Sequence, residues 1–363
     1  MKKVFSLFYF FVTFVNSCSM NMNFVMTTNN SYVEPTAVAI QSLKNTSSHD
    51  GFTNTIIIFV YEVSGENQEK LKKFQDDKTK ICLIDLNSPK FSEIMSECAR
   101  IAPDGSYFNK LVCFHTFFPE IWQLCLEEVM KIKEFIYLDS DLIILKDIRL
   151  LYQECFQEKE NQPIISANLN FFKQAGSSKE YDLLGGVGAI FSESLRGSPP
   201  TKPGYGMAEA HGGVVFWNME LILRDRIKFP HFDSDEYAFT SVLKDLKRKK
   251  IYFFSPEWNA TPQDILSADK ISLKLGRDKG EIEYERFLST VATDTSDKIE
   301  REMFQPSTLD CLNKLASRDI SIIHWDEHEK PWKKESCESD SWEARWWEIR
   351  KSLELTKIFP IRE

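Results

Sequence analysis

The feature that most constrains the fold of this chain is an apolar run that two carboxylates interrupt. Phe135-Ile136-Tyr137-Leu138 is typical of a buried strand, Asp139-Ser140-Asp141 follows directly, and Leu142-Ile143-Ile144-Leu145 resumes the apolar pattern. A buried strand does not carry two unpaired carboxylates unless a cation offsets their desolvation and mutual repulsion. Hard oxygen ligands at this spacing suit Mg2+ or Mn2+, which usually accompany a phosphate-bearing substrate. The alternative is a strand-end Asp that caps the next turn beside a second, solvated Asp.

A second short strand near the C-terminus adds a nitrogen ligand to this hypothesis. Ile320-Ser321-Ile322-Ile323 leads into His324, and Lys330-Pro331-Trp332 follows six residues after the histidine. An imidazole beside two carboxylates favours Mn2+ over Mg2+ or Ca2+, and Lys330 is placed to meet a diphosphate. Taken alone, His324 is more typical of a hydrogen-bonded core residue, and Lys-Pro-Trp of a turn.

Together these residues resemble glycosyltransferase family 8, the retaining nucleotide-sugar transferases that include glycogenin-like and lipooligosaccharide galactosyltransferase-like enzymes. The resemblance rests on residues 137–141, His324 and residues 330–332 at the usual separation, and it extends over residues 24–332. It implies a GT-A type α/β fold, a single Rossmann-like domain with a mostly parallel central sheet and helices on both faces. The alternation of apolar strands with helical patterns before residue 139 predicts the same succession, with ligands at the carboxyl ends of the strands.

Further segments match the family in the same order. Residues 24–32 and 37–43 resemble the first strand, the nucleotide-binding loop and the first helix of the family. Residues 108–111 resemble a segment that sets a basic residue against the donor, and residues 212–218 resemble a later strand. The resemblance implies metal ligation by Asp139, Asp141 and His324. It implies donor binding by Thr28, Asn29, Tyr32, Lys110, Asp139, Ser140, Gly213 and Lys330.

Several positions depart from the family pattern. Asn29 and Asn30 stand where an Asp is usual, and amide groups there can still bind uracil or ribose without a charge. His211 replaces a common Asn, and Glu327 replaces a usual Gly close to the diphosphate. We therefore expect sugar recognition and the loop around the diphosphate to differ from the family.

The resemblance places the pair Asp235-Glu236 at the reacting sugar, with Glu236 in place of a usual Gln. Breaking the anomeric bond leaves negative charge on the diphosphate and positive character on the sugar ring, so a divalent ion and Lys330 would stabilise the leaving group. Glu236 would act as a nucleophile, stabilise an oxocarbenium-like state, or only hydrogen-bond a sugar hydroxyl. The expected function is transfer of a hexose from a UDP-sugar to a hydroxyl of a carbohydrate, lipid or protein, with Mn2+ as the metal and Mg2+ as the alternative.

Two other classes of protein fit less well. A haloacid dehalogenase phosphatase also carries Asp-x-Asp after a strand, but it needs the motif in its first strand and Thr or Val where this chain has Ile143. An inactive UDP-sugar-binding module of the same fold is the stronger alternative, because of Asn29, His211 and Glu327. Release of UDP in the presence of Mn2+ separates an active enzyme from a binding module.

The predicted organisation has three parts, of which the first is residues 1–18, a probable signal peptide or N-terminal anchor. Residues 19–335 form the glycosyltransferase domain with a helical insertion at about 265–317, and residues 185–206 are expected to form a long loop. Helices are predicted near residues 107–113 and 120–132, and a strand at 166–168. Residues 336–363 carry an amphipathic helix over 341–355 whose stripe of Trp342, Trp346, Ile349 and Leu353 packs on the domain or, alternatively, on a membrane surface.

Charge and the N-terminus bear on partners and location. The net charge of -9 argues against a nucleic-acid partner. Residues 1–18 resemble a signal peptide, with Lys2 and Lys3 before a short apolar stretch, and Cys18 weakly matches a lipoprotein cleavage box. We expect a protein of the secretory pathway, or one exported and associated with a membrane through its N-terminus, and a cytoplasmic protein if this segment is not a working signal. Eight cysteines without a Cys-x-x-Cys pair speak against structural zinc.

Overall fold

The computed structural model describes most of the predicted strands and both halves of the candidate site. The described residues are 20–47, 51–101, 117–156, 182–191, 208–224, 249–254, 256–262, 265–266, 314–325, 330–333 and 341–360. Among them no helix is long and apolar enough to span a lipid bilayer.

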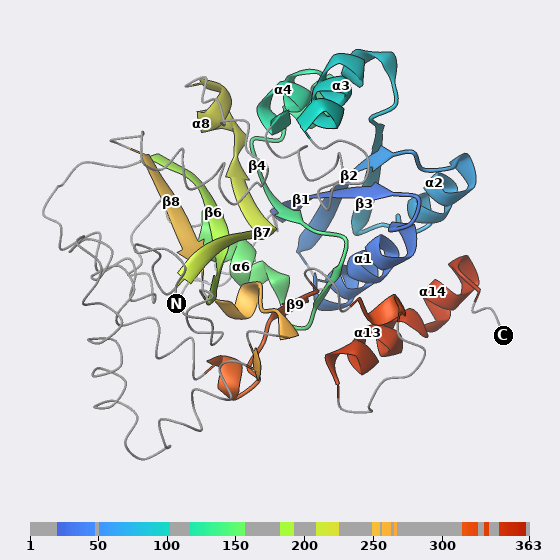
Figure 1. Ribbon diagram of the computed structural model, residues 1–363, viewed down its shortest axis with the longest axis vertical. Helices are drawn as coiled ribbons and strands as arrows, with labels where there is room; N and C mark the ends of the chain where they lie inside the picture. The colour runs from blue at the N-terminus through green and yellow to red at the C-terminus, as the bar shows by residue number, and fades with distance from the viewer. Residues whose placement is uncertain are drawn as a thin grey trace, which may run out of the picture.

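A central sheet organises the chain (Figure 1). Its seven strands among the described residues are β1 (Met20–Asn29), β2 (Phe52–Tyr61), β3 (Thr79–Asp85), β4 (Glu134–Leu138), β6 (Asp182–Phe191), β7 (Ala208–Asn218) and β8 (Lys249–Phe254). They run in the order β3-β2-β1-β4-β7-β6-β8. Every neighbouring pair is parallel except those of β7, which is antiparallel to both β4 and β6. The predicted mostly parallel sheet is confirmed.

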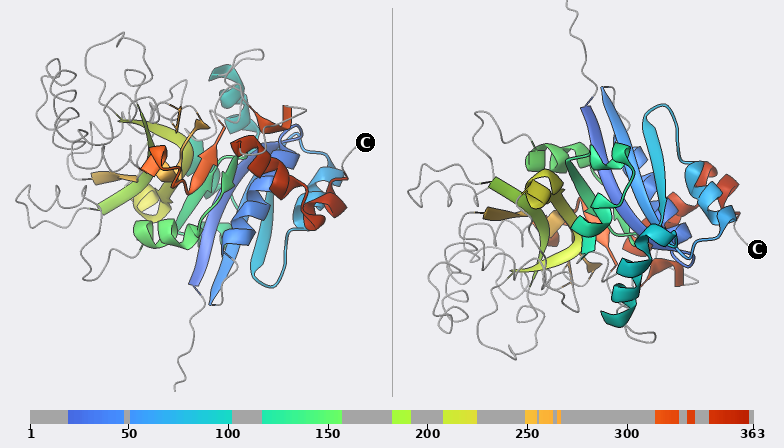
Figure 2. Two further views of the ribbon diagram at one scale, coloured as in Figure 1. Left: turned by 90° about the horizontal axis from the view of Figure 1, so that it is seen from below. Right: turned by 90° about the horizontal axis from the view of Figure 1, so that it is seen from above.

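Helices cover both faces of this sheet, as the two turned views show (Figure 2). One hydrophobic cluster joins the sheet to α1 (Val33–Ser47), α2 (Gly65–Lys72), α6 (Ile148–Phe156), α13 (Trp342–Arg350) and α14 (Leu353–Ile358). The opposite cluster joins it to α3 (Ser92–Ile101), α4 (Phe118–Gln123), α5 (Glu127–Met130) and α8 (Met219–Arg224). Strand alternation separates the two clusters: in β4, Ile136 and Leu138 face the first, and Phe135 and Tyr137 face the second. This sandwich of layers confirms the α/β class.

A second, two-stranded sheet positions the end of the Asp-Ser-Asp segment. Its strands β5 (Leu142–Ile144) and β9 (Ile322–His324) are antiparallel, with Leu142 opposite His324. On its other side β9 contacts the segment after the short helix Pro256–Trp258, where the His324 amide donates to the carbonyl of Ala260 at 2.9 Å. Residues 142 and 324 are far apart in sequence but are paired directly in the fold.

Several predicted elements differ from the structure. Residues 185–191 were expected in a loop but belong to β6, where they pair with β7 and β8. The helix predicted over 120–132 is divided into α4 and α5, and the one over 341–355 into α13 and α14. The predicted elements at 107–113 and 166–168, residues 192–206 of the expected loop and nearly all of the insertion at 265–317 lie outside the described residues.

Candidate metal and donor site

The three candidate ligands come from the ends of neighbouring strands. Asp139 follows β4, and its amide donates to the carbonyl of Gly213 in β7 at 2.9 Å. Asp141 precedes β5, and its carbonyl accepts from the amide of Trp325 at 2.9 Å. His324 ends β9 opposite Leu142. Backbone pairing, rather than side-chain contact alone, therefore brings the two carboxylates and the imidazole together.

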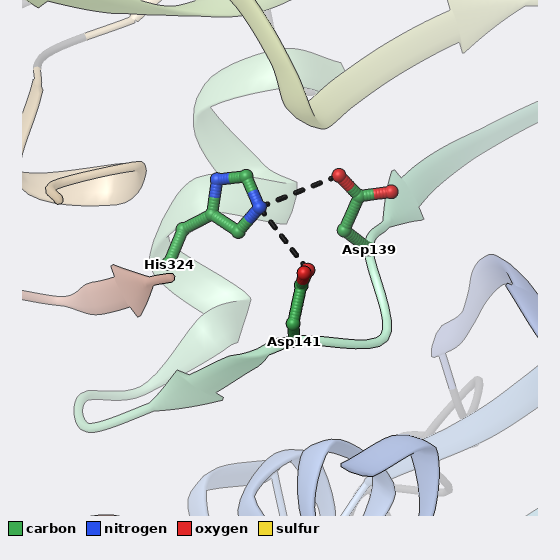
Figure 3. Close-up of side chains that lie close together, drawn as sticks. All are labelled: Asp139, Asp141 and His324. Atoms are coloured by element: carbon green, nitrogen blue, oxygen red, sulfur yellow. Dashed lines mark hydrogen bonds and ion pairs between the residues drawn. The ribbon is translucent and has the colours of Figure 1, made fainter. Parts of the chain in front are cut away.

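Figure 3 shows the imidazole of His324 pointing between the two carboxylates. Its Nε2 lies 3.2 Å from Oδ1 of Asp141 and 3.4 Å from Oδ2 of Asp139. One ligand atom from each of the three residues lies within 4.8 Å of the others, and this group alone satisfies that criterion among the described residues. Two carboxylate oxygens and an imidazole nitrogen are a donor set that suits Mn2+. The residues present thus fit the predicted divalent cation.

Lys330 is the second cation of this cluster. Its Nζ donates to Oδ2 of Asp141 at 2.5 Å and to the carbonyl of Trp325, and its side chain is buried. Burial alone would lower the pKa of Lys330, but Asp141 raises it above its ordinary value. Burial alone would raise the pKa of Asp141, but His324 and Lys330 hold it well below its usual range. Lys330 therefore stays positively charged beside an ionised Asp141.

His324 is protonated in the metal-free protein. Burial alone would lower the pKa of its imidazole, but hydrogen bonds with Asp139 and Asp141 raise it to about 10. Two cationic side chains thus neutralise two carboxylates when no metal is bound. An imidazole can ligate a metal only in its neutral form. A divalent cation that binds His324 therefore has to displace this proton.

The predicted nucleotide-binding loop adjoins the cluster. Oδ1 of Asn29 accepts from the amides of Ser31 and Tyr32 at 3.0 and 3.2 Å, so this Asn closes a turn as an Asp would. The Tyr32 ring packs edge-on against Trp332, with 5.6 Å between the ring centroids. This contact joins the loop after β1 to the segment that carries Lys330.

Buried hydroxyl groups join the Asp-Ser-Asp segment to α1. Ser140 Oγ donates to the carbonyl of Thr27, and Thr36 Oγ1 lies 3.0 Å from Ser140 Oγ and 2.8 Å from Thr28 Oγ1. Ser140 and Thr28, both predicted to bind the donor, therefore use their hydroxyls to fix the shape of the site. The roles of Thr27 and Thr36 were not predicted from the sequence. The available signal was the threonine pair near the end of β1, together with the threonine in the first turn of α1.

Gly213, predicted to bind the donor, packs on the candidate ligand His324. A Cβ at residue 213 would lie 2.4 Å from the imidazole of His324. Lys110, Asp235 and Glu236 lie outside the described residues, so their assignment to the donor and the reacting sugar stays a prediction.

Comparison with known proteins agrees with the resemblance. Residues 23–178 match the family model described as Glycosyl transferase family 8. The match includes Asp139 and Asp141 and ends before His324 and Lys330, which the fold brings to the same place. No significantly similar sequence was found among curated proteins.

Two solved glycosyltransferase structures are similar to this chain. The apo structure of the bifunctional glycosyltransferase WbbM is 12% identical to this chain, with a TM-score of 0.51. The match covers 93% of this chain and 51% of WbbM, so this chain spans about half the length of WbbM. The galactosyltransferase LgtC in complex with donor and acceptor sugar analogues is 12% identical with a TM-score of 0.49, over 94% of this chain and 98% of that one. At these identities the WbbM likeness is one of fold, which is the GT-A fold.

Proposed function

We propose, from the match of residues 23–178 to the model of glycosyltransferase family 8, that the protein is a metal-dependent retaining hexosyltransferase. Its donor would be a UDP-sugar and its acceptor a hydroxyl of a carbohydrate, lipid or protein. One observation carries the proposal: Asp139, Asp141 and His324 converge from separate strands, with a buried Lys330 against them. A turn-capping Asp beside a solvated one would not gather a buried imidazole and a buried ammonium around it.

The charges of these residues fit the departure of a nucleoside diphosphate. When bound, a divalent cation supplies Lewis-acid stabilisation of the charge that develops on the leaving diphosphate. Lys330 adds a fixed positive charge in a buried setting, where it needs no reorganisation as that charge develops. Asp139 and Asp141 would hold the divalent cation near the carboxyl ends of β4 and β1. Ligands bind at this edge in sheets of this kind.

Retention of configuration is part of the proposal and rests on Asp235 and Glu236. A carboxylate on the face of the sugar opposite the leaving group can form a covalent intermediate or stabilise an oxocarbenium-like state. Donor turnover by Glu236→Gln separates these roles from a simple hydrogen bond. Near-normal turnover would exclude a required nucleophile at this position.

The experiment that tests the proposed function is a donor screen read by UDP release. UDP-glucose, UDP-galactose, UDP-N-acetylglucosamine and UDP-glucuronate are each incubated with the protein, with Mn2+ and then with a chelator. We expect Mn2+-dependent release from one of them and its loss in Asp141→Asn.

A matched control is available in the same sheet. Asp85 ends β3 and caps the following turn, where its Oδ1 accepts from the amide of Asn87 at 2.9 Å. Asp85→Asn should leave UDP release unchanged. Binding of a UDP-sugar without release from any donor would instead indicate the inactive binding module.

A further inference from the structure

The two oxygens of Asp139 have different partners. Oδ2 faces Nε2 of His324 at 3.4 Å, whereas Oδ1 accepts a hydrogen bond from the phenol of Tyr137 at 2.8 Å. Tyr137 lies in β4 and is 1% exposed, so the phenol is buried, whereas the Asp139 side chain is 31% exposed. The carboxylate therefore cannot rotate about its Cβ–Cγ bond without breaking its hydrogen bond to the buried phenol of Tyr137.

The phenol of Tyr137 also contacts a second hydroxyl, that of Thr27. Thr27 Oγ1 lies 2.8 Å from Tyr137 Oη. A phenol has one hydrogen, which Tyr137 gives to Asp139, so toward Thr27 it acts as the acceptor and Thr27 is the donor. Thr27 thus donates to Tyr137, and Tyr137 donates to Asp139. The parallel pairing of β1 with β4 places these residues next to one another.

Asp141 is held in the same way by a different donor. Lys330 Nζ binds its Oδ2 at 2.5 Å, which leaves Oδ1 toward Nε2 of His324 at 3.2 Å. Each carboxylate thus turns one oxygen to the imidazole and has the other held by a donor outside the ligand set. Asp139, Asp141 and His324 would thus each offer one atom to a divalent cation.

We propose that Tyr137 is a positioning residue that holds Asp139 as a one-oxygen ligand of the divalent cation, with Thr27 orienting its hydroxyl. This inference rests on the metal-dependent function proposed above. Apart from Thr27 and Asp139, which bind its hydroxyl, Tyr137 packs in a cluster of apolar residues that includes Phe135, Val215 and Trp217, so packing alone would be met by Phe. A buried hydroxyl costs stability unless it is paired, and here its partner is a candidate metal ligand.

The test measures binding of Mn2+ alone, from the EPR signal of the free ion. Tyr137→Phe should raise the Kd for Mn2+ about tenfold or more, the usual cost of losing a group that orients a ligand. Tyr152→Phe is the matched control, because it also removes a buried phenol, one that donates to the carbonyl of Asn21 at the opposite end of β1. The control should bind Mn2+ as the wild type does.

A second variant keeps the test decisive if Tyr137→Phe folds poorly. Thr27→Val should raise the Kd by a smaller factor, and the double variant should bind Mn2+ no more weakly than Tyr137→Phe, because Thr27 acts through Tyr137. Unchanged Mn2+ affinity in folded Tyr137→Phe, or in Thr27→Val, would overturn the inference and leave the proposed function standing. Failure of the wild type itself to bind Mn2+ would overturn both.

Discussion

Gly213 lies so close to the imidazole of His324 that a methyl group on residue 213 would be 2.4 Å from both Nδ1 and Cε1. The same glycine accepts the amide hydrogen of Asp139 through its carbonyl at 2.9 Å. β7 therefore sets the position of the imidazole and of one carboxylate with a single residue, and a side chain there is excluded by the space that the ring occupies.

Gly213→Ala is expected to move the His324 ring away from the carboxylates, because the new contact is far shorter than van der Waals distance. We expect the Kd for Mn2+ to rise at least about tenfold, as for other losses of ligand orientation. Gly65→Ala is the control, since a Cβ there meets no atom within 4 Å. Equal Mn2+ affinity in the two variants would show that the ring does not ligate the ion.

Lys330→Met should affect both stability and turnover. Removing one partner of a buried ion pair leaves Asp141 less well compensated, which costs about 3 kcal/mol of unfolding free energy. UDP release should fall at least about a hundredfold, because a charge that acts on the leaving group is lost. The comparison is with Lys333→Met at the end of the short helix Pro331–Lys333 that follows Lys330, because the Lys333 side chain is exposed. Denaturant unfolding and UDP release measure the two effects, and equal behaviour of the variants would contradict the role of Lys330.

Metal binding should strengthen as pH rises. The pKa of His324 in the metal-free protein is about 10, so near neutral pH each bound ion displaces about one proton. Affinity for Mn2+ should then increase about tenfold per pH unit between pH 7 and 9. Calorimetry in two buffers of different ionisation enthalpy counts the released proton, and His324→Gln should release none. An affinity that does not change with pH in the wild type would contradict this account.

Rising pH should lower the stability of the metal-free protein, although it strengthens metal binding. The pKa of His324 rises on folding from its ordinary value of 6.5, so the proton stabilises the metal-free fold fully below that pH. This contribution is lost as pH rises through about 10. Thermal unfolding in chelator should therefore show a decline over this range that is absent from His324→Gln.

The C-terminal helix region should behave as core. Trp346 in α13 is fully buried, and its ring lies 5.7 Å from that of Trp332, so the alternative of a membrane-facing stripe does not describe this residue. Trp346→Ala should lower the unfolding free energy by about 3 to 5 kcal/mol. Arg345→Ala on the exposed side of α13 should change it by less than about 0.5 kcal/mol. Equal, small effects in denaturant unfolding would favour a surface role.

Sequence predicted the parts of the fold where pattern and packing agree. The apolar runs of β1, β2 and β4 were found because these strands are largely buried on both faces, and the edge strand β3 was found from its apolar run Ile81–Ile84 although it is only partly buried. β6 was missed because Asp182–Phe191 contains three glycines and reads as a loop; its strand state comes from pairing with β7 and β8. No glycine or proline marks the break between α4 and α5, so that division has no local signal.

Some residues of the site were predicted from the sequence and others were not. Asp139, Asp141 and His324 were predicted together because each follows or precedes a short apolar strand, and strand pairing does gather them. Tyr137 and Thr27 were not singled out, since a phenol in a buried strand looks like any core aromatic. Their role depends on which side of the sheet each faces at the meeting of β1 and β4, and that is a property of tertiary structure.

The central claim is that Asp139, Asp141 and His324 share one cation that also binds the donor diphosphate. Pulsed EPR of Mn2+ bound in the presence of UDP tests it most directly, because nuclear couplings identify the atoms next to the ion. We predict coupling to an imidazole nitrogen that disappears in His324→Gln, together with coupling to phosphorus. A bound Mn2+ that shows phosphorus but no protein nitrogen, or a nitrogen signal that survives in His324→Gln, would contradict the claim.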